Sequence, residues 1–202
     1  ILPKTVNSNT LIVLISVSGN TVETLSILKS AQNINCKIIA FSSGGKIQEY
    51  CIKNKIEYKI ISKYHSPRAS FTSFLYSILK VLHTTLEIKE EDILESISEL
   101  EKIKKQICSV NLTDSNPSLI LAKWITGYPM IYYPFGLQSV GIRFKNSLNE
   151  NSKIHAFTED VMEACHNGVV SWEKKSNVQP ILIEGQDDHI KTKERWQIFK
   201  KF

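Results

Sequence analysis

The sequence predicts an α/β protein with doubly wound parallel sheets. Short apolar runs suited to buried strands alternate with segments of helical periodicity, and polar, Gly- and Ser-rich loops separate them. In the first part of the chain, strands are expected at residues 11–15, 36–41 and 57–61. Strands that alternate with helices in this way form parallel sheets through right-handed crossovers. The same alternation restarts after residue 117.

A polar loop follows the first expected strand and precedes a helix at about 21–32. Asn20 is expected to cap this helix, with Glu23 completing a capping box. Backbone amides and the positive end of the helix dipole favour an anion there, and Ser16, Ser18 and Thr21 add hydroxyl donors. The loop has neither the lysine of a Walker loop nor spaced glycines, so it suits a single phosphate on a small molecule. A Ser/Gly-rich turn that only caps a helix is the alternative.

Two further features of the first half bear on this site. Residues 42–45 form a second Ser/Gly loop, which is also expected at the carboxyl ends of the strands, where ligands of such sheets bind. Ser66 and Pro67 are expected to start a long helix, as its cap and its first residue. Arg68 would then lie in the first turn, where a cation opposes the helix dipole, so it either points into solvent or has an anionic partner.

The domain organisation is predicted as residues 1–88, a connecting helix and linker at 89–116, and residues 117–202. The connecting segment has an amphipathic pattern with a highly charged outer face, and it ends in a Thr-Asp-Ser-Asn-Pro boundary signal. Beyond it we expect, in order, a helix at 117–126, a strand at 129–133, a helix at 137–150, a strand at 153–157, a helix and loop through His166, a strand at 179–184 and a final charged helix.

Composition is that of an ordinary globular protein of 202 residues, with 42% hydrophobic and 22% charged residues. Its net charge of +5 comes from lysines scattered among glutamates, so nucleic acid is not an expected partner. No apolar run is long enough for a membrane span, and cytoplasmic location is the expectation. The chain has no C-x-x-C pair, which argues against a zinc knuckle or a redox dithiol; its cysteines are Cys36, Cys51, Cys108 and Cys165.

Four separated motifs carry a family resemblance. They are Ser-x-Ser-Gly-Asn-Thr at 16–21, Pro-Arg-Ala at 67–69, Asn-Glu-Asn-Ser-Lys at 149–153 and Glu-Ala-Cys-His-Asn at 163–167. In this order, and over nearly the whole chain, they resemble the bifunctional phosphoglucose/phosphomannose isomerases. That family has two sugar isomerase (SIS) domains, which implies two SIS-type subdomains here, the first one incomplete. The resemblance implies that the sugar phosphate is held by Ser16, Ser18 and Thr21.

The resemblance also implies catalytic roles. Glu150 would be the base that moves one proton between C1 and C2 through a cis-enediol, and a single carboxylate suffices for that step. Arg68 would stabilise the developing oxyanion, since its guanidinium stays charged. His166 would assist ring opening near neutral pH. The implied reaction interconverts glucose 6-phosphate and fructose 6-phosphate, with mannose 6-phosphate as a second aldose, and it calls for no metal or redox cofactor.

Departures from the family pattern define the rival interpretations. The family has an upstream Gly-Gly-Ser-Gly type loop and a C-terminal catalytic lysine, and neither falls within this chain, so we expect it to lack N- and C-terminal parts. Val17 and Gly168 replace a frequent aromatic and a frequent acidic residue. A non-catalytic phosphosugar-binding module and a relative acting on amino sugars remain as alternatives. Taken alone, Glu150 could be a solvated glutamate, and His166 could precede a turn with Gly168 in the left-handed conformation.

Quaternary structure follows from the same resemblance. It implies a homodimer in which each active site borrows His166 from the neighbouring subunit. The apolar face expected on the helix after Arg68 could serve such an interface, although the core of a monomer would show the same pattern.

Overall fold

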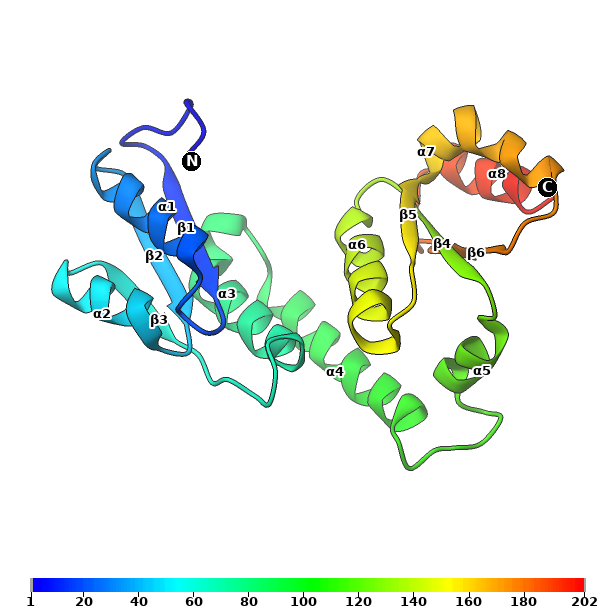
Figure 1. Ribbon diagram of the computed structural model, residues 1–202, viewed down its shortest axis with the longest axis horizontal. Helices are drawn as coiled ribbons and strands as arrows, with labels where there is room; N and C mark the ends of the chain where they lie inside the picture. The colour runs from blue at the N-terminus through cyan, green and yellow to red at the C-terminus, as the bar shows by residue number, and fades with distance from the viewer. Residues whose placement is uncertain (1, 202) are drawn as a thin grey trace. The chain divides into compact units, whose positions relative to one another are not determined.

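The computed structural model describes residues 2–201 and divides into two compact units, Ile1–Leu100 and Glu101–Phe202. Each unit contains one three-stranded sheet in which all strands are parallel (Figure 1). This confirms the predicted α/β fold class with parallel sheets. Within the described range, no helix is both long and apolar enough to cross a membrane.

The first sheet has the order β1-β2-β3, and helices cover both of its faces. Its strands and crossover helices are β1 (Leu11–Ser16), α1 (Val22–Gln32), β2 (Lys37–Ser42), α2 (Gly45–Lys53) and β3 (Glu57–Ile60). On one face Ala40 packs with Leu28 of α1 and Ile47 of α2. On the other face Phe41 packs with Phe74 of α3 (Phe71–Leu86). The alternation of side chains along β2 thus gives each face of the sheet its own core.

Parallel register places the carboxyl ends of β1 and β2 side by side. Ser16 pairs with Ser42, so the loops that follow the two strands are neighbours. After α3 the chain continues into α4 (Glu90–Ile107), in which no side chain is buried.

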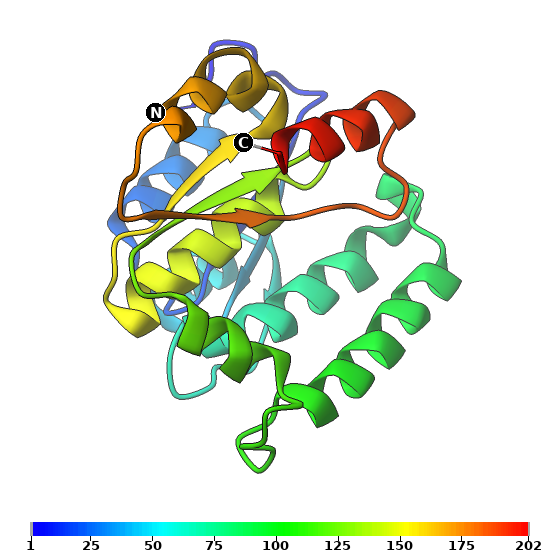
Figure 2. The same ribbon diagram turned by 90° about the vertical axis from the view of Figure 1, so that its right-hand side faces the viewer.

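The second sheet has the order β5-β4-β6, with β4 in the centre (Figure 2). Its elements are α5 (Pro117–Trp124), β4 (Tyr128–Tyr133), α6 (Gln138–Ser147), β5 (Phe157–Asp160), α7 (Val161–Glu163), β6 (Val178–Leu182) and α8 (Ile190–Phe199). Gly141 of α6 approaches the ring of Tyr133 on one face. On the other face Tyr132 packs with Val161 and with Trp196 of α8. Successive connections therefore run on opposite faces, as in a doubly wound sheet.

The predicted strand at 153–157 is wrong in position, because β5 begins only at Phe157. Lys153 has a φ of +59°, and the side chain of Asn149 accepts a hydrogen bond of 3.0 Å from the backbone N–H of Ala156. That N–H is therefore unavailable to a strand ladder. Pairing with β4 starts at Phe157, which lies opposite Met130.

Candidate functional site

The loop at residues 16–21, here called the serine loop, gathers hydroxyl groups at the carboxyl end of β1. The Oγ atom of buried Ser16 lies 2.8 Å from Oγ1 of Thr21 and accepts a hydrogen bond of 3.2 Å from the N–H of Gly19. Exposed Ser18 accepts a hydrogen bond of 3.2 Å from the N–H of Asn20 through its Oγ. That hydroxyl keeps its own proton available for an acceptor. The structure therefore brings Ser16 and Thr21 into contact and places Ser18 in the same turn.

The predicted capping box at Asn20 is wrong. Helix α1 begins at Val22 with Thr21 as its N-cap, and no side chain caps its first turn. The side chain of Asn20 turns to the neighbouring loop, where its Oδ1 accepts a hydrogen bond of 3.1 Å from the N–H of Lys46. Its Nδ2 donates a bond of 3.1 Å to the carbonyl of Ser18. The first turn of α1 thus lacks the side-chain acceptor that would compete with an anion.

The second loop, residues 42–46, is here called the glycine loop, and its hydroxyls are turned inward. Ser42 is fully buried, and its Oγ donates a hydrogen bond of 2.8 Å to the carbonyl of Gly44. The same Oγ lies 3.1 Å from the hydroxyl oxygen of Tyr58. The Oγ of Ser43 donates to the carbonyl of Val17 in the serine loop. The Ser43 hydroxyl thus connects the two loops, and the Ser42 hydroxyl connects the glycine loop to β3.

The amides of α2 are also engaged by the serine loop. The N–H of Lys46 donates to the side chain of Asn20, and the N–H of Ile47 donates 2.9 Å to the carbonyl of Gly19. Of the two adjacent helix N-termini, the one at α1 therefore keeps the properties of an anion site, and the one at α2 supports it.

Arg68 does not lie in the first turn of a long helix, which corrects the predicted start at Ser66 and Pro67. Residues Arg68–Ser70 form a short 3-10 turn, and α3 begins at Phe71. The physical cause is Ser70, whose side chain is fully buried. Its hydroxyl donates a hydrogen bond of 3.1 Å to the carbonyl of Ser66 and accepts one of 3.1 Å from the backbone N–H of Tyr64. Arg68 is exposed on this turn.

Glu150 lies in a π-helical turn, Leu148–Ser152, that continues α6. The predicted helix at 137–150 therefore has its α-helical part at Gln138–Ser147, and Glu150 is exposed beyond it. At the end of this turn, Nζ of Lys153 donates a hydrogen bond of 2.5 Å to the backbone carbonyl of Glu150.

His166 lies in a second π-helical turn, Ala164–Gly168, and is exposed. Asn167 beside it donates 2.7 Å to Oε1 of Glu163. Gly168 has a φ of −75°, so the chain continues into a 3-10 helix, and the alternative of a left-handed terminating turn is wrong. Single π-turns are rare and are frequently found at functional sites. Two of the three predicted catalytic residues occupy one each.

The thiol next to His166 is not activated. Burial raises the pKa of Cys165, while the charge of Arg195 opposes this rise. A thiol with a raised pKa is neutral at pH 7, so a Cys-His nucleophile is not supported here.

Glu159 on β5 is the carboxylate whose environment disfavours ionisation. Burial raises its pKa first, and the charges of Glu163 and Asp160 add to the rise. Its folded pKa lies above the unfolded value, so its contribution to stability is present below the unfolded pKa and is lost as pH rises through the folded pKa.

We therefore expect Glu159→Gln to stabilise the protein at pH 7, with a rise in melting temperature on the order of 2 °C. The gain should shrink as the pH is lowered toward 4, where the wild-type carboxyl is protonated. Thermal denaturation followed by circular dichroism across this range measures it. Glu173→Gln, at an exposed position in the same unit, is the control. A lower melting temperature for Glu159→Gln at pH 7 would contradict the assignment.

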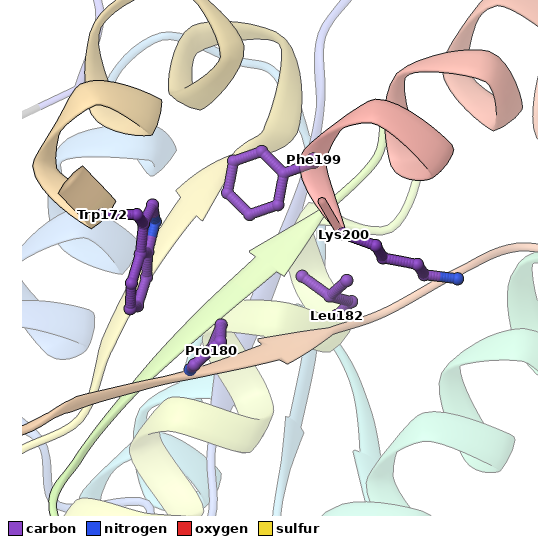
Figure 3. A pocket seen from close by; sticks show the side chains of 5 residues that line it. All are labelled: Trp172, Pro180, Leu182, Phe199 and Lys200. Atoms are coloured by element: carbon purple, nitrogen blue, oxygen red, sulfur yellow. The ribbon is translucent and has the colours of Figure 1, made fainter. Parts of the chain in front are cut away.

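The six predicted site residues are divided between the units. Ser16, Ser18, Thr21 and Arg68 belong to the first unit, and Glu150 and His166 belong to the second. None of the six residues lines a cavity of about 320 Å³ on the α8 face of the second sheet (Figure 3). Apolar side chains and one lysine line it: Trp172, Pro180, Leu182, Phe199 and Lys200. Nζ of Lys200 forms an ion pair of 2.6 Å with Oε1 of Glu184.

Sequence reasoning missed the residues that hold the serine loop in place. The sequence pattern predicts that Asn20 caps α1, whereas its side chain bonds to the first turn of α2, and the pattern does not predict the bond from Ser43 to Val17. The available signal was the Gly-Gly pair at 44–45, because consecutive glycines indicate a close backbone approach.

Comparisons with known proteins agree with this assignment of fold. Residues 114–202 match the family described as the bacterial phospho-glucose isomerase C-terminal SIS domain. The chain is 30% identical over 207 residues to the bifunctional phosphoglucose/phosphomannose isomerase of Aquifex aeolicus. The aligned region covers 99% of this chain and 60% of that protein. It is also 30% identical over 188 residues to the D-glucosamine-6-phosphate 4-epimerase of Sulfolobus acidocaldarius, covering 92% of this chain and 58% of that protein.

Among solved structures, glucosamine-6-phosphate deaminase from Thermotoga maritima aligns with a TM-score of 0.71 at 14% identity, covering 99% of this chain and 60% of that one. This likeness concerns the fold alone. The chain spans about 60% of the length of the curated relatives named above. Residues 114–202 therefore match a SIS domain of the bacterial phospho-glucose isomerase type, and most of the chain is similar to bifunctional phosphoglucose/phosphomannose isomerases.

Proposed function

We propose that this chain takes part in an aldose-ketose isomerisation between glucose 6-phosphate and fructose 6-phosphate, with mannose 6-phosphate as a second aldose. The observation that carries the proposal is the N-terminus of α1, which has no side-chain cap and is bordered by the hydroxyls of Ser16, Ser18 and Thr21. A phosphate monoester placed there gains the helix dipole, backbone N–H donors and hydroxyl donors. Four bifunctional phosphoglucose/phosphomannose isomerases are 30–31% identical to the chain.

The proposed chemistry needs one proton to move between C1 and C2. Glu150 takes this proton from one carbon and returns it to the other, as a carboxylate on one face of a cis-enediol can. Arg68 stabilises the enediolate oxygen, since a guanidinium remains charged throughout. His166 transfers a proton between ring and hydroxyl oxygens when the sugar opens. Exposed positions on short turns leave all three side chains accessible to a ligand.

The proposal includes a cytoplasmic homodimer whose active sites share His166 between subunits. All four cysteines are free thiols, as is usual in a reducing compartment. Exposed apolar side chains on α3, which include Phe71 and Leu86, supply surface for a subunit contact. Sedimentation of the active sample measures the subunit number, and a fully active monomer would exclude the shared histidine.

Incubation with glucose 6-phosphate in deuterated water tests the activity. We expect fructose 6-phosphate to form with deuterium at C1, and glucose 6-phosphate re-formed by the reverse reaction to carry deuterium at C2, because the base exchanges its proton with water at the enediol stage. Proton and carbon NMR follow both. Thermal stabilisation by the sugar phosphate with no exchange at C2 would favour a non-catalytic phosphosugar-binding module instead.

An amino-sugar substrate is the second candidate function. The similarity to the Sulfolobus 4-epimerase, at 30% identity over 92% of this chain, favours it specifically. Glucosamine 6-phosphate in the same NMR assay separates the two. Inversion at C4 or release of ammonia, with glucose 6-phosphate unchanged, would replace the first proposal by this one.

A further inference from the structure

We propose that Asn20 is a positioning residue for the phosphate, and that it fixes the serine loop onto the N-terminus of α2. The inference rests on the proposed phosphosugar site at α1 and adds the residue that shapes it. Asn20 is an exposed residue of the serine loop, and its side chain reaches Lys46, which lies 26 residues further along the chain.

Both ends of the Asn20 amide are in use. Its Oδ1 accepts a hydrogen bond of 3.1 Å from the N–H of Lys46, in the first turn of α2. Its Nδ2 donates a hydrogen bond of 3.1 Å to the carbonyl of Ser18. One side chain thus connects the backbone of the serine loop to the backbone of α2. An aspartate lacks the donor, and a serine is too short to span both partners.

The glycine loop is shaped to receive this amide. Gly45 has a φ of +72°, and a Cβ atom at this position would lie 2.8 Å from Oδ1 of Asn20 and 2.7 Å from the carbonyl of Ser18. Any side chain at Gly45 would therefore push Asn20 and Ser18 away. The fit of the two loops depends on Asn20 on one side and on the missing side chain on the other.

The hydrogen bonds of the Asn20 side chain do not involve the hydroxyls that are proposed to hold the phosphate. Asn20 therefore acts on the anion through Ser18, whose carbonyl it holds and whose Oγ accepts from the Asn20 backbone N–H. A loop that is ordered before binding loses less conformational freedom when the ligand arrives. Without Asn20, the serine loop has to be ordered at the expense of binding free energy.

The test compares Asn20→Ala with Asn54→Ala in the whole chain. Asn54 is the C-cap residue of α2, and both ends of its side-chain amide also form hydrogen bonds. Its Oδ1 accepts a bond of 3.2 Å from the side chain of Gln32, and its Nδ2 donates a bond of 2.8 Å to the carbonyl of Tyr50. Isothermal titration with inorganic phosphate and with glucose 6-phosphate should show a Kd about tenfold weaker for Asn20→Ala. Asn54→Ala should stay within about twofold of the wild type, even where the two melting temperatures fall alike.

Two further measurements separate positioning from general stability. The amide proton of Lys46 should move upfield in the NMR spectrum of Asn20→Ala and stay in place in Asn54→Ala. Asn20→Ser, which keeps one acceptor, should fall between wild type and alanine in affinity.

The outcomes distinguish the inference from the function beneath it. Unchanged phosphate affinity in Asn20→Ala, with a wild type that binds, overturns the positioning role alone. A wild type that binds neither phosphate nor glucose 6-phosphate overturns the proposed site and the inference together.

Discussion

Replacing Glu150 by glutamine is expected to abolish isomerisation while phosphosugar binding persists. Glutamine has nearly the same shape, and it lacks the carboxylate that would take the proton from C1 or C2. We expect kcat to fall by about 10³-fold or more, which is within the range for loss of a general base. The Kd for glucose 6-phosphate should change by less than about threefold. Deuterium exchange at C2 measures the first quantity, and calorimetry measures the second.

Glu194→Gln is the matched control for this change. Glu194 is an exposed glutamate of the same unit, in α8, and it forms an ion pair of 2.8 Å with Lys191. Its replacement should leave turnover and binding unchanged, because surface ion pairs contribute little. Loss of both turnover and binding in Glu150→Gln, or retention of turnover, would count against Glu150 as the base.

The position of Glu150 illustrates what periodicity predicts well and what it does not. The apolar spacing of residues 137–150 indicates a helix, and α6 is there. Periodicity does not specify whether the last turn is α-helical or π-helical, and that depends on which carbonyl each terminal N–H meets. The end of this segment is marked by the positive φ of Lys153 and by the hydrogen bond that the Asn149 side chain accepts from the backbone N–H of Ala156. The same hydrogen bond occupies the N–H of Ala156, and β5 begins only at the next residue, Phe157.

The serine loop shows a similar division between local and tertiary information. Its hydroxyl residues and the helix after it could be read from residues 11–23, since strand, loop and helix are all local patterns. The role of Asn20 could not, because its partner Lys46 lies 26 residues away and belongs to another helix. A sequence pattern ranks Asn20 as a good cap for the helix beside it. The close approach of the glycine loop provides a different N–H, and tertiary structure overrides the local preference.

Gly19→Ala is expected to have the largest effect on stability and to abolish phosphate binding. Gly19 has a φ of +67°, and a Cβ there would lie 1.7 Å from the carbonyl oxygen of Gly44 and 2.9 Å from Oγ of Ser42. The two contacted groups are themselves joined by a hydrogen bond of 2.8 Å from buried Ser42 to the carbonyl of Gly44, which limits how far either can move. We expect the free energy of unfolding to fall by about 3–5 kcal/mol, as the sum of left-handed strain and overpacking. Urea denaturation and phosphate titration measure the two effects.

Gly136→Ala separates the two contributions to that loss. Gly136 also has a positive φ, +88°, but a Cβ at this position meets no atom within 4 Å. Its replacement should therefore show the backbone strain alone, about 1–2 kcal/mol, and leave phosphate binding intact. The excess loss in Gly19→Ala then reports the contact between the serine loop and the glycine loop. Equal losses for the two variants, with phosphate binding kept in both, would mean that the loops separate easily and that their contact does not shape the anion site.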